Sequence, residues 1–175
     1  MSPPASQLSK RAHIPRWLSP ILLTVLGLGV HVALPWALSL ITPHYGWADG
    51  RPGVWNVTGL IPIALGLAMI VWGLSLHFVR ATGVLEWEGT PRHLLLTGPY
   101  RLSRNPMYLL ELVMWLGWAI FYGSIAVLIG FILWWVFFAF IQIPTEERQL
   151  EARFGETYLR YAEAVPRWFG VPRQR

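Results

Sequence analysis

Three long stretches without charge constrain this chain most strongly. Leu18–Thr42 and Pro52–Val79 contain no Asp, Glu, Lys or Arg, and Asn105–Thr145 contains only Glu111. A helix needs about 20 apolar residues to cross the hydrocarbon core of a bilayer. Hydrophobic residues make up 54% of the 175 residues and charged ones only 13%, and so short a chain lacks the interior to bury three such runs in water. The sequence therefore predicts an all-α membrane protein with one membrane domain.

The third run must fold back on itself. Its 41 residues would form a single helix about twice as long as the bilayer is thick. Tyr122-Gly123-Ser124 is the best turn within it, which predicts a helical hairpin. Pro35 is expected to kink the first span, for which a cleavable signal peptide is an alternative that the length of the run disfavours. Four transmembrane helices follow, at about 18–42, 54–79, 105–121 and 125–144, with a loop at 80–104 and a tail at 145–175.

The basic residues lie almost entirely on one side of these spans. The segment before the first span carries three of them, the loop 80–104 carries four and the tail carries six, whereas the opposite side holds only Arg51. By the positive-inside rule both termini and the loop are expected in the cytoplasm, with a bacterial inner membrane as the expected location. The net charge of +5 then reflects topology and contact with the lipid bilayer, and no nucleic-acid partner is expected.

Metal and disulfide chemistry find no support in the sequence. The chain has no cysteine, and its five histidines never fall at a close metal-binding spacing. Disulfides, thiolate nucleophiles and Cys-ligated metals are therefore excluded, and no metal site is expected. His77, near the end of the second span, is interpreted as structural or interfacial.

The tail after Pro144 has helical periodicity. Its apolar residues recur at steps of three or four and charged residues fill the other positions, which predicts an amphipathic helix that lies on the membrane or covers the loop. The apolar stripe consists of Leu150, Phe154, Tyr158, Tyr161 and Val165.

Two polar motifs flank the hairpin. GPYRLSRNPMY occupies residues 98–108 at its start, and Glu146-Glu147 follows its end. Because the third span begins and the fourth ends at the same face, antiparallel packing should bring Tyr108 and Glu146 to a similar depth. The arginines and the positive end of the third helix favour a carboxylate or phosphate, and the glutamates can hold an ammonium or accept from hydroxyls. A cluster with both signs of charge suits a zwitterionic ligand.

S-adenosylmethionine offers the matching groups: a carboxylate, an ammonium, a ribose, and an aromatic base that Tyr100 or Tyr108 could contact. Methyl transfer from it is an in-line displacement, for which a protein mainly aligns the reactants and excludes water. Glu111 lies on the same helical face as Tyr108, about one turn inside the membrane, where a carboxylate is costly and points to function. It is a candidate general base or arginine partner, with an interfacial side chain that reaches water as the alternative.

Each motif also has a purely structural explanation. Asn105 and Pro106 are typical of a helix start, as N-cap and first residue. Arg101 and Arg104 could serve only as topology determinants, and Thr145-Glu146-Glu147 could be a second helix start with acidic residues at the positive end of the dipole.

Together the motifs resemble the integral-membrane methyltransferases of the isoprenylcysteine carboxyl methyltransferase and phospholipid N-methyltransferase group. Residues 98–108 are similar to the family's Gly-Pro-Tyr-Arg-x-x-Arg-His-Pro-x-Tyr, and residues 146–167 to its C-terminal signature. The resemblance covers about Leu95–Arg167 and implies methyl transfer from S-adenosylmethionine to a lipidic or small hydrophobic acceptor. The candidate cofactor-binding residues are Tyr100, Arg101, Arg104, Asn105, Pro106, Tyr108, Glu146 and Glu147, and the catalytic candidates are Glu111 and Arg104.

Asn105 departs from the family pattern, because many members have His there and Asn cannot titrate. Two alternatives stay open. Membrane sterol reductases are similar in the hairpin region but use NADPH, and a non-catalytic membrane subunit could keep the same fold.

Overall fold

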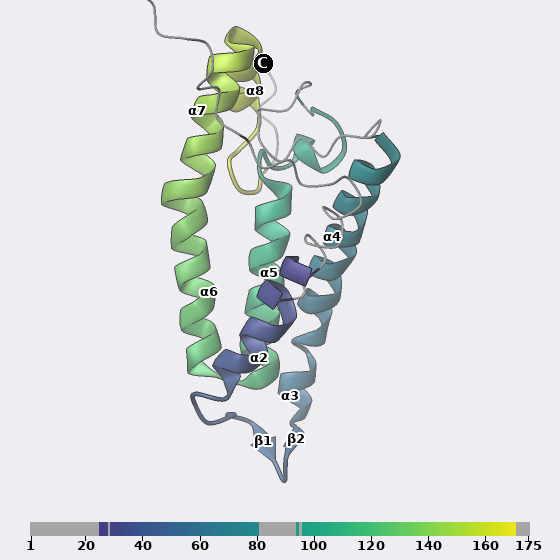
Figure 1. Cartoon of the computed structure of the whole chain (residues 1–175), viewed down its shortest axis with the longest axis vertical. Helices are drawn as coiled ribbons and strands as arrows, with labels where there is room; N and C mark the ends of the chain where they lie inside the picture. Colours follow the sequence, from purple (N-terminus) through teal and green to yellow (C-terminus); the bar gives the residue numbers. More distant parts are fainter. Residues whose placement is uncertain (1–24, 28, 81–93, 95, 171–175) are drawn as a thin grey trace, which may run out of the picture.

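The computed structural model describes residues 25–27, 29–80, 94 and 96–170, with the backbone alone for 73–80. The described part is mostly helical, with long helices running side by side, a small β-hairpin at one end and short helices at the other (Figure 1). Several sequence predictions lie outside the described residues. They concern the first part of the first span, the side chains of His77 and Arg80, and the basic residues Lys10, Arg11, Arg16, Arg92, Arg173 and Arg175.

Two helical stretches are long and apolar enough to cross a membrane, Val54–Trp72 and Ile125–Phe154. The first combines the short α3 (Val54–Val57) with α4 (Leu60–Arg80). Shorter apolar helices cover Val25–Ser39 and Pro106–Tyr122. The elements of the remaining long helix are α6 (Ile125–Phe137), the π-helical turn η4 (Phe138–Gln142) and α7 (Ile143–Phe154).

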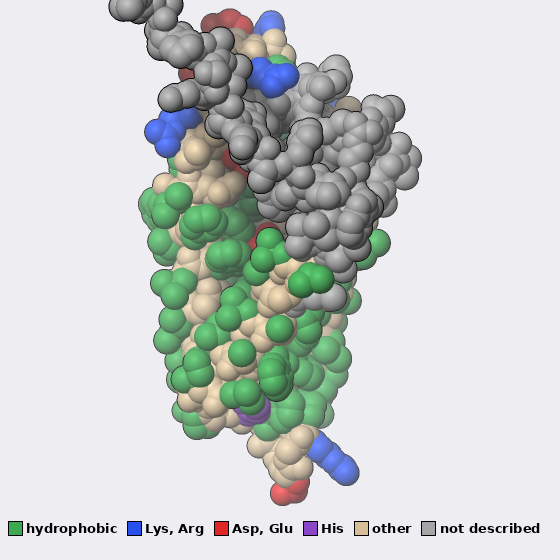
Figure 2. Space-filling model, in the orientation of Figure 1, with side chains coloured by type: hydrophobic (Ala, Val, Ile, Leu, Met, Phe, Trp, Pro, Cys, Tyr) green, Lys and Arg blue, Asp and Glu red, His purple; other side chains and the backbone are tan. Residues whose placement is uncertain are grey.

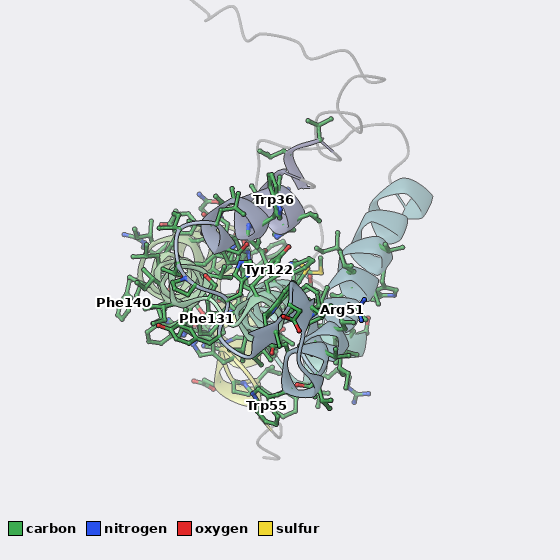
Figure 3. The ribbon with its side chains drawn as sticks, turned by 90° about the horizontal axis from the view of Figure 1, so that it is seen from below. Trp36, Arg51, Trp55, Tyr122, Phe131 and Phe140 are labelled. Atoms are coloured by element: carbon green, nitrogen blue, oxygen red, sulfur yellow. The ribbon has the colours of Figure 1, made fainter. Side chains whose placement is uncertain are left out.

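The outer surface of the helices is apolar along most of their length. Figure 2 shows a broad hydrophobic body with charged side chains gathered at its two ends. Large apolar side chains stand exposed on it, such as Leu133 at 63% and Phe140 at 68% exposure. Seen from below, Phe140 and Trp55 lie at the periphery whereas Tyr122 lies near the middle (Figure 3). An apolar surface of this extent fits a hydrocarbon surrounding rather than water.

The predicted hairpin is confirmed at its turn. Helix α5 (Pro106–Tyr122) ends at Gly123, which adopts a left-handed conformation with φ 57°. Ser124 then caps α6, its hydroxyl accepting from the Val127 amide at 3.4 Å. Glycine tolerates positive φ without the steric penalty of a Cβ, so the Gly-Ser pair both ends one helix and starts the next.

Helices α4 and α5 are held together by a glycine contact. A Cβ on Gly66 would collide with the Met114 side chain, and one on Gly117 would collide with Gly59 and Ile63. Small residues let membrane helices approach closely and gain dispersion contacts that lipid cannot replace. This contact fixes α5, whose first residues belong to the first polar motif, against α4.

The short apolar helix Val25–Ser39 contains an irregular segment. A π-helical turn, η2 (Gly29–Ala33), precedes α2 (Leu34–Ser39), and Pro35 lies in the first turn of α2. Extra residues in a helical turn re-aim side chains, which is why such turns recur at functional positions. Here η2 carries His31.

The end of the bundle opposite the polar motifs is closed by a β-hairpin, β1 (Trp47–Ala48) and β2 (Arg51–Pro52). Its turn uses positive φ at Asp49 and Gly50. The buried Asn56 amide donates to the backbone oxygens of Tyr45 and Ile120, both at 3.0 Å. These bonds tie the hairpin to the end of α5.

The fourth helix differs from its expected boundary at Pro144. It continues through Pro144 into α7 and breaks at Gly155, after which α8 (Glu156–Ala164) begins. A proline removes one backbone donor and crowds the preceding turn. The π-helical turn η4 directly before it supplies the extra residue that absorbs this defect. Thr145 accordingly caps nothing, because its hydroxyl donates to the Ile141 carbonyl at 2.6 Å.

Candidate functional site

The two motifs lie together at the end of the bundle where α5 begins. The Arg104 amide donates to the Pro166 carbonyl at 2.9 Å, and the Gly170 amide donates to the Leu102 carbonyl at 3.1 Å. The Asn105 side-chain amide donates to the Arg167 carbonyl at 3.0 Å. Residues 102–105 therefore run alongside residues 166–170 and are joined to them through the backbone, so the end of the tail is part of the site.

Glu147 is the electrostatic centre of the cluster. One of its oxygens, Oε1, lies 2.9 Å from Arg104 Nη1 and accepts from Arg167 Nε at 3.2 Å. The other, Oε2, lies 2.5 Å from Arg167 Nη2. The side chains of Arg104 and Glu147 are each only 16% exposed. Paired contacts between guanidinium and carboxylate groups are among the strongest polar interactions in proteins, and here they link the segment directly before α5 to α7 and to the tail.

Glu146 faces the start of α5 instead. Its Oε1 accepts a hydrogen bond from the Tyr108 hydroxyl and another from Gln142 Nε2 at 2.7 Å. Gln142 belongs to η4, so the π-helical turn presents the amide that orients this carboxylate. The Tyr108 ring packs on Phe138 with 4.5 Å between ring centroids. The predicted approach of Tyr108 to Glu146 is confirmed.

Three tyrosines lie between the motif and the tail helix α8. The Tyr161 hydroxyl donates to the Tyr100 carbonyl at 2.8 Å, and the buried Tyr158 hydroxyl accepts from Arg104 Nη1 at 3.4 Å. Burial raises the pKa of Tyr161 to about 12. Burial, with the Glu146 carboxylate as a second cause, also raises the pKa of Tyr100. All three hydroxyls therefore stay protonated near neutral pH and can donate.

The remaining candidates from the motif take different positions. Pro106 is buried as the first residue of α5. Asn105 occupies the N-cap position, but its side chain makes no capping bond and binds the tail instead. The backbone amide of Asn105 donates to the Ser103 hydroxyl at 3.0 Å. Arg101 is exposed, and its side chain forms no ion pair or hydrogen bond with the other described residues. The structure thus leaves Arg101 outside the connected cluster.

Glu111 lies apart from these residues, one helical turn further along α5. Its Oε1 accepts from Trp134 Nε1 on α6 at 2.7 Å and lies 3.8 Å from His31 Nε2 on η2. The Glu111 side chain is 18% exposed. No arginine with a described side chain contacts Glu111, so the arginine partner that the sequence offered as one possibility is not found there; an indole and an imidazole lie beside the carboxylate instead.

The polar cluster has the charges and the spare donor needed for a zwitterionic ligand. Two guanidiniums share the Glu147 carboxylate, which leaves a net positive charge beside the positive end of α5. Arg104 Nε is buried without a hydrogen-bond partner among the described residues, and buried donors of this kind normally bind something. Glu146, the residue directly before Glu147 on α7, supplies further negative charge. In the described part of the chain no group of three or more His, Asp or Glu could hold a metal ion.

Four residues of this region were not proposed as site residues from the sequence: His31, Trp134, Gln142 and Arg167. Arg167 falls within the C-terminal signature, which was a signal for it. The other three lie in apolar runs, where nothing distinguishes them until the helices are packed.

Comparisons with known proteins agree with the two motifs. Residues 54–157 match the sequence pattern of the phospholipid methyltransferase family. Protein-S-isoprenylcysteine O-methyltransferase A of Arabidopsis thaliana is 32% identical over 173 residues, covering 85% of this chain and 84% of the plant protein. No solved structure matches the chain.

Two bacterial proteins are also similar over shorter regions. The cobalt-zinc-cadmium resistance protein CzcN of Cupriavidus metallidurans is 34% identical over 117 residues, which cover 66% of this chain and about half (53%) of that protein. An uncharacterized protein of Haemophilus influenzae is 37% identical over 62 residues, 35% of this chain and 98% of its own length. Because the family description covers more than half of the chain and the plant enzyme aligns with most of it, the chain belongs to the membrane methyltransferase family of phospholipid methyltransferases and isoprenylcysteine O-methyltransferases.

Proposed function

We propose that this protein transfers a methyl group from S-adenosylmethionine to a lipidic or small hydrophobic acceptor at the cytoplasmic face of the membrane. The observation that carries the proposal is the joining of both motifs in one cluster through the Arg104–Glu147 ion pair. A cluster with both signs of charge at the mouth of a membrane hairpin suits a zwitterionic methyl donor on one side and an acceptor entering from the bilayer on the other.

The roles of the residues follow from their positions. Arg104, with its unpartnered Nε, would hold the carboxylate of the donor, supported by the N-terminus of α5. Glu146 would bind the ammonium group or a ribose hydroxyl of the methyl donor, and the Tyr100 and Tyr108 rings would contact the donor's adenine base. When bound, S-adenosylmethionine supplies a methyl group on a sulfonium, which is activated toward a nucleophile.

Arg104, Asn105 and Glu147 have a second task in this proposal. Their bonds to residues 166–167 hold the tail over the start of α5. Closing the site in this way excludes water and fixes the geometry of the reactants, which together account for most of what such a transfer requires. Pro106 starts the helix, and Arg101 at the exposed edge would act by attracting anions rather than by direct contact.

The arrangement in the membrane is part of the proposal. We infer four spans, made by the first apolar run, α3–α4, α5 and α6–α7, with both termini in the cytoplasm of a bacterial inner membrane. Support comes from the basic residues of the described part of the chain. Arg51 in β2 is the only arginine there at the end that carries the β-hairpin, and the other arginines with described side chains belong to the segments at the motif end. Figure 2 shows Lys and Arg side chains at these two ends and not along the apolar body between them. The 17 residues of α5 are at the lower limit for a span.

Thermal unfolding of the purified full-length chain in detergent tests the proposal. S-adenosylhomocysteine should raise the melting temperature, because a ligand that binds only the folded state stabilises it by mass action. NADPH at the same concentration should leave the melting temperature unchanged. Stabilisation by NADPH alone would replace the methyltransferase proposal with a reductase.

A further inference from the structure

The cluster around Glu111 is not used by the cofactor site proposed above. Three elements meet there: α5 provides Glu111, α6 provides Trp134 and the π-helical turn η2 provides His31. The Glu111 and His31 side chains are only 18% and 15% exposed. An ionisable pair is costly inside an apolar surrounding and persists in membrane proteins mainly where it has a task.

The hydrogen bonds of this cluster are incomplete. Glu111 Oε1 accepts from Trp134, whereas its second oxygen, Oε2, accepts from no described residue. His31 Nδ1 is buried and has no partner in the described part of the chain. The titratable groups that face Glu111 there are His31 from η2 and Tyr108 from α5. The cluster thus orients a carboxylate through one oxygen and leaves the other available.

Glu111 is also well placed with respect to the proposed cofactor site. It follows Tyr108 by three residues on one helical face, a rise of about 4.5 Å, and the Tyr108 hydroxyl in turn binds Glu146. The other two carboxylates of the region have tasks in the proposed cofactor site. Glu146 Oε1 accepts from Tyr108 and Gln142, and this carboxylate is assigned to the donor's ammonium or a ribose hydroxyl, whereas Glu147 is shared by Arg104 and Arg167. Glu111 is therefore the carboxylate of this region that the cofactor site leaves unused, and its Oε2 accepts from no described residue.

We propose that Glu111 is the proton acceptor for a nucleophile that carries an N–H or S–H bond, so that the methyl acceptor is an amine or a thiol rather than a carboxylic acid. The inference rests on the proposed function. The nitrogen or sulfur lone pair forms a bond to the methyl carbon, and the bond from that carbon to the sulfonium breaks, leaving its electron pair on sulfur. The proton of the nucleophile passes to the Glu111 carboxylate. A carboxylate nucleophile would carry no proton and would need no base.

Trp134 and His31 act through Glu111. The indole N–H fixes one carboxylate oxygen, and the imidazole, 3.8 Å away, limits the rotation of the same side chain. Both are positioning residues, and neither contacts the acceptor in this proposal.

The acceptor class is tested with the full-length chain in detergent. The three probes have the same chain length and differ in the nucleophile: dodecylamine, dodecanethiol and dodecanoate. The wild type should methylate the amine or the thiol and not dodecanoate. Glu111→Gln, which keeps the size and the bond from Trp134, should lose at least about a hundredfold in turnover, the usual contribution of a general base. Trp134→Phe should lower kcat about tenfold with the KM for S-adenosylmethionine unchanged. Glu151→Gln, the same change at an exposed position of α7, should behave as wild type.

Two further measurements need no turnover. Glu111→Gln should bind S-adenosylhomocysteine with wild-type affinity, because Glu111 is outside the cofactor site. Without any methyl donor, dodecylamine should raise the melting temperature of the wild type and of Glu151→Gln more than that of Glu111→Gln. If the wild type binds S-adenosylhomocysteine but methylates neither the amine nor the thiol, or if Glu111→Gln keeps its turnover, this inference is wrong while the proposed function stands. Failure of the wild type to bind S-adenosylhomocysteine would remove both.

Discussion

Glu147→Gln should weaken the fold and the cofactor site together. The substitution removes the charge that two guanidiniums share at 2.9 and 2.5 Å and leaves them facing each other. Breaking a fully buried ion pair costs about 3–5 kcal/mol, and an exposed one contributes about 0–1 kcal/mol. Because Glu147 and Arg104 are 16% exposed but Arg167 is 40% exposed, we expect an intermediate loss of about 2–3 kcal/mol in the free energy of unfolding.

The assay combines thermal unfolding in detergent with calorimetric titration of S-adenosylhomocysteine. The stability loss corresponds to a fall in melting temperature of roughly 5–10 °C for a chain of this size. Affinity should fall about ten- to a hundredfold, as for the loss of a charge-assisted hydrogen bond. Arg104→Ala should do the same, and the double variant should lose less than the sum because both residues belong to one network.

Glu151→Gln is the matched control, since it makes the same change one helical turn further along α7 at an exposed side chain. Its melting temperature and affinity should equal those of the wild type. A stability loss in Glu147→Gln without any loss of affinity would assign Glu147 a structural role alone. Wild-type stability and affinity together would show that the Arg104–Glu147 ion pair neither stabilises the protein in solution nor shapes the cofactor site.

Three other predictions address the helix contact, the topology and the pH dependence. Gly117→Leu should lower the free energy of unfolding by about 1–3 kcal/mol, because the added side chain must displace α4. Chemical denaturation in detergent measures this loss, and a denaturation midpoint equal to that of the wild type would contradict the close contact. The chain has no cysteine, so Asp49→Cys and Glu151→Cys can be labelled singly in whole cells with an impermeant maleimide, which should reach the first and not the second. Burial raises the pKa of Tyr161 to about 12, above the value of about 10 in an unfolded chain, so stability should fall as the pH rises from about 10 to 12. Tyr161→Phe, which also loses the bond to the Tyr100 carbonyl, should show a shallower fall in a pH series of melting temperatures, and an unchanged slope would contradict it.

The parts predicted from the sequence are those that local chemistry decides. The turn at Gly123 follows from a Gly-Ser pair in the middle of a run too long for one span, and the structure has it there. The approach of Tyr108 to Glu146 follows from the hairpin alone, because both residues lie near the same mouth. The membrane topology and the roles of the individual site residues remain predictions.

The parts that were missed depend on how the helices pack. Pro144 was expected to end the fourth helix, but the π-helical turn before it lets the helix continue. No local sequence pattern predicts that turn. Asn105 reads as a capping residue, yet its amide binds the Arg167 carbonyl, 62 residues further along the chain. The contact between His31 and Glu111 depends on the rotation of η2 against α5, which the apolar sequence around His31 does not specify.

Methyl transfer itself is the most direct test of the central claim. The full-length protein in lipid nanodiscs would be incubated with S-adenosylmethionine tritiated in its methyl group, a bacterial lipid extract and the dodecyl probes. Tritium should appear in the organic phase in an amount equal to the S-adenosylhomocysteine formed, and Arg104→Ala should reduce both equally. A folded protein that forms no S-adenosylhomocysteine with any of these acceptors, and whose melting temperature this compound does not change, would contradict the account.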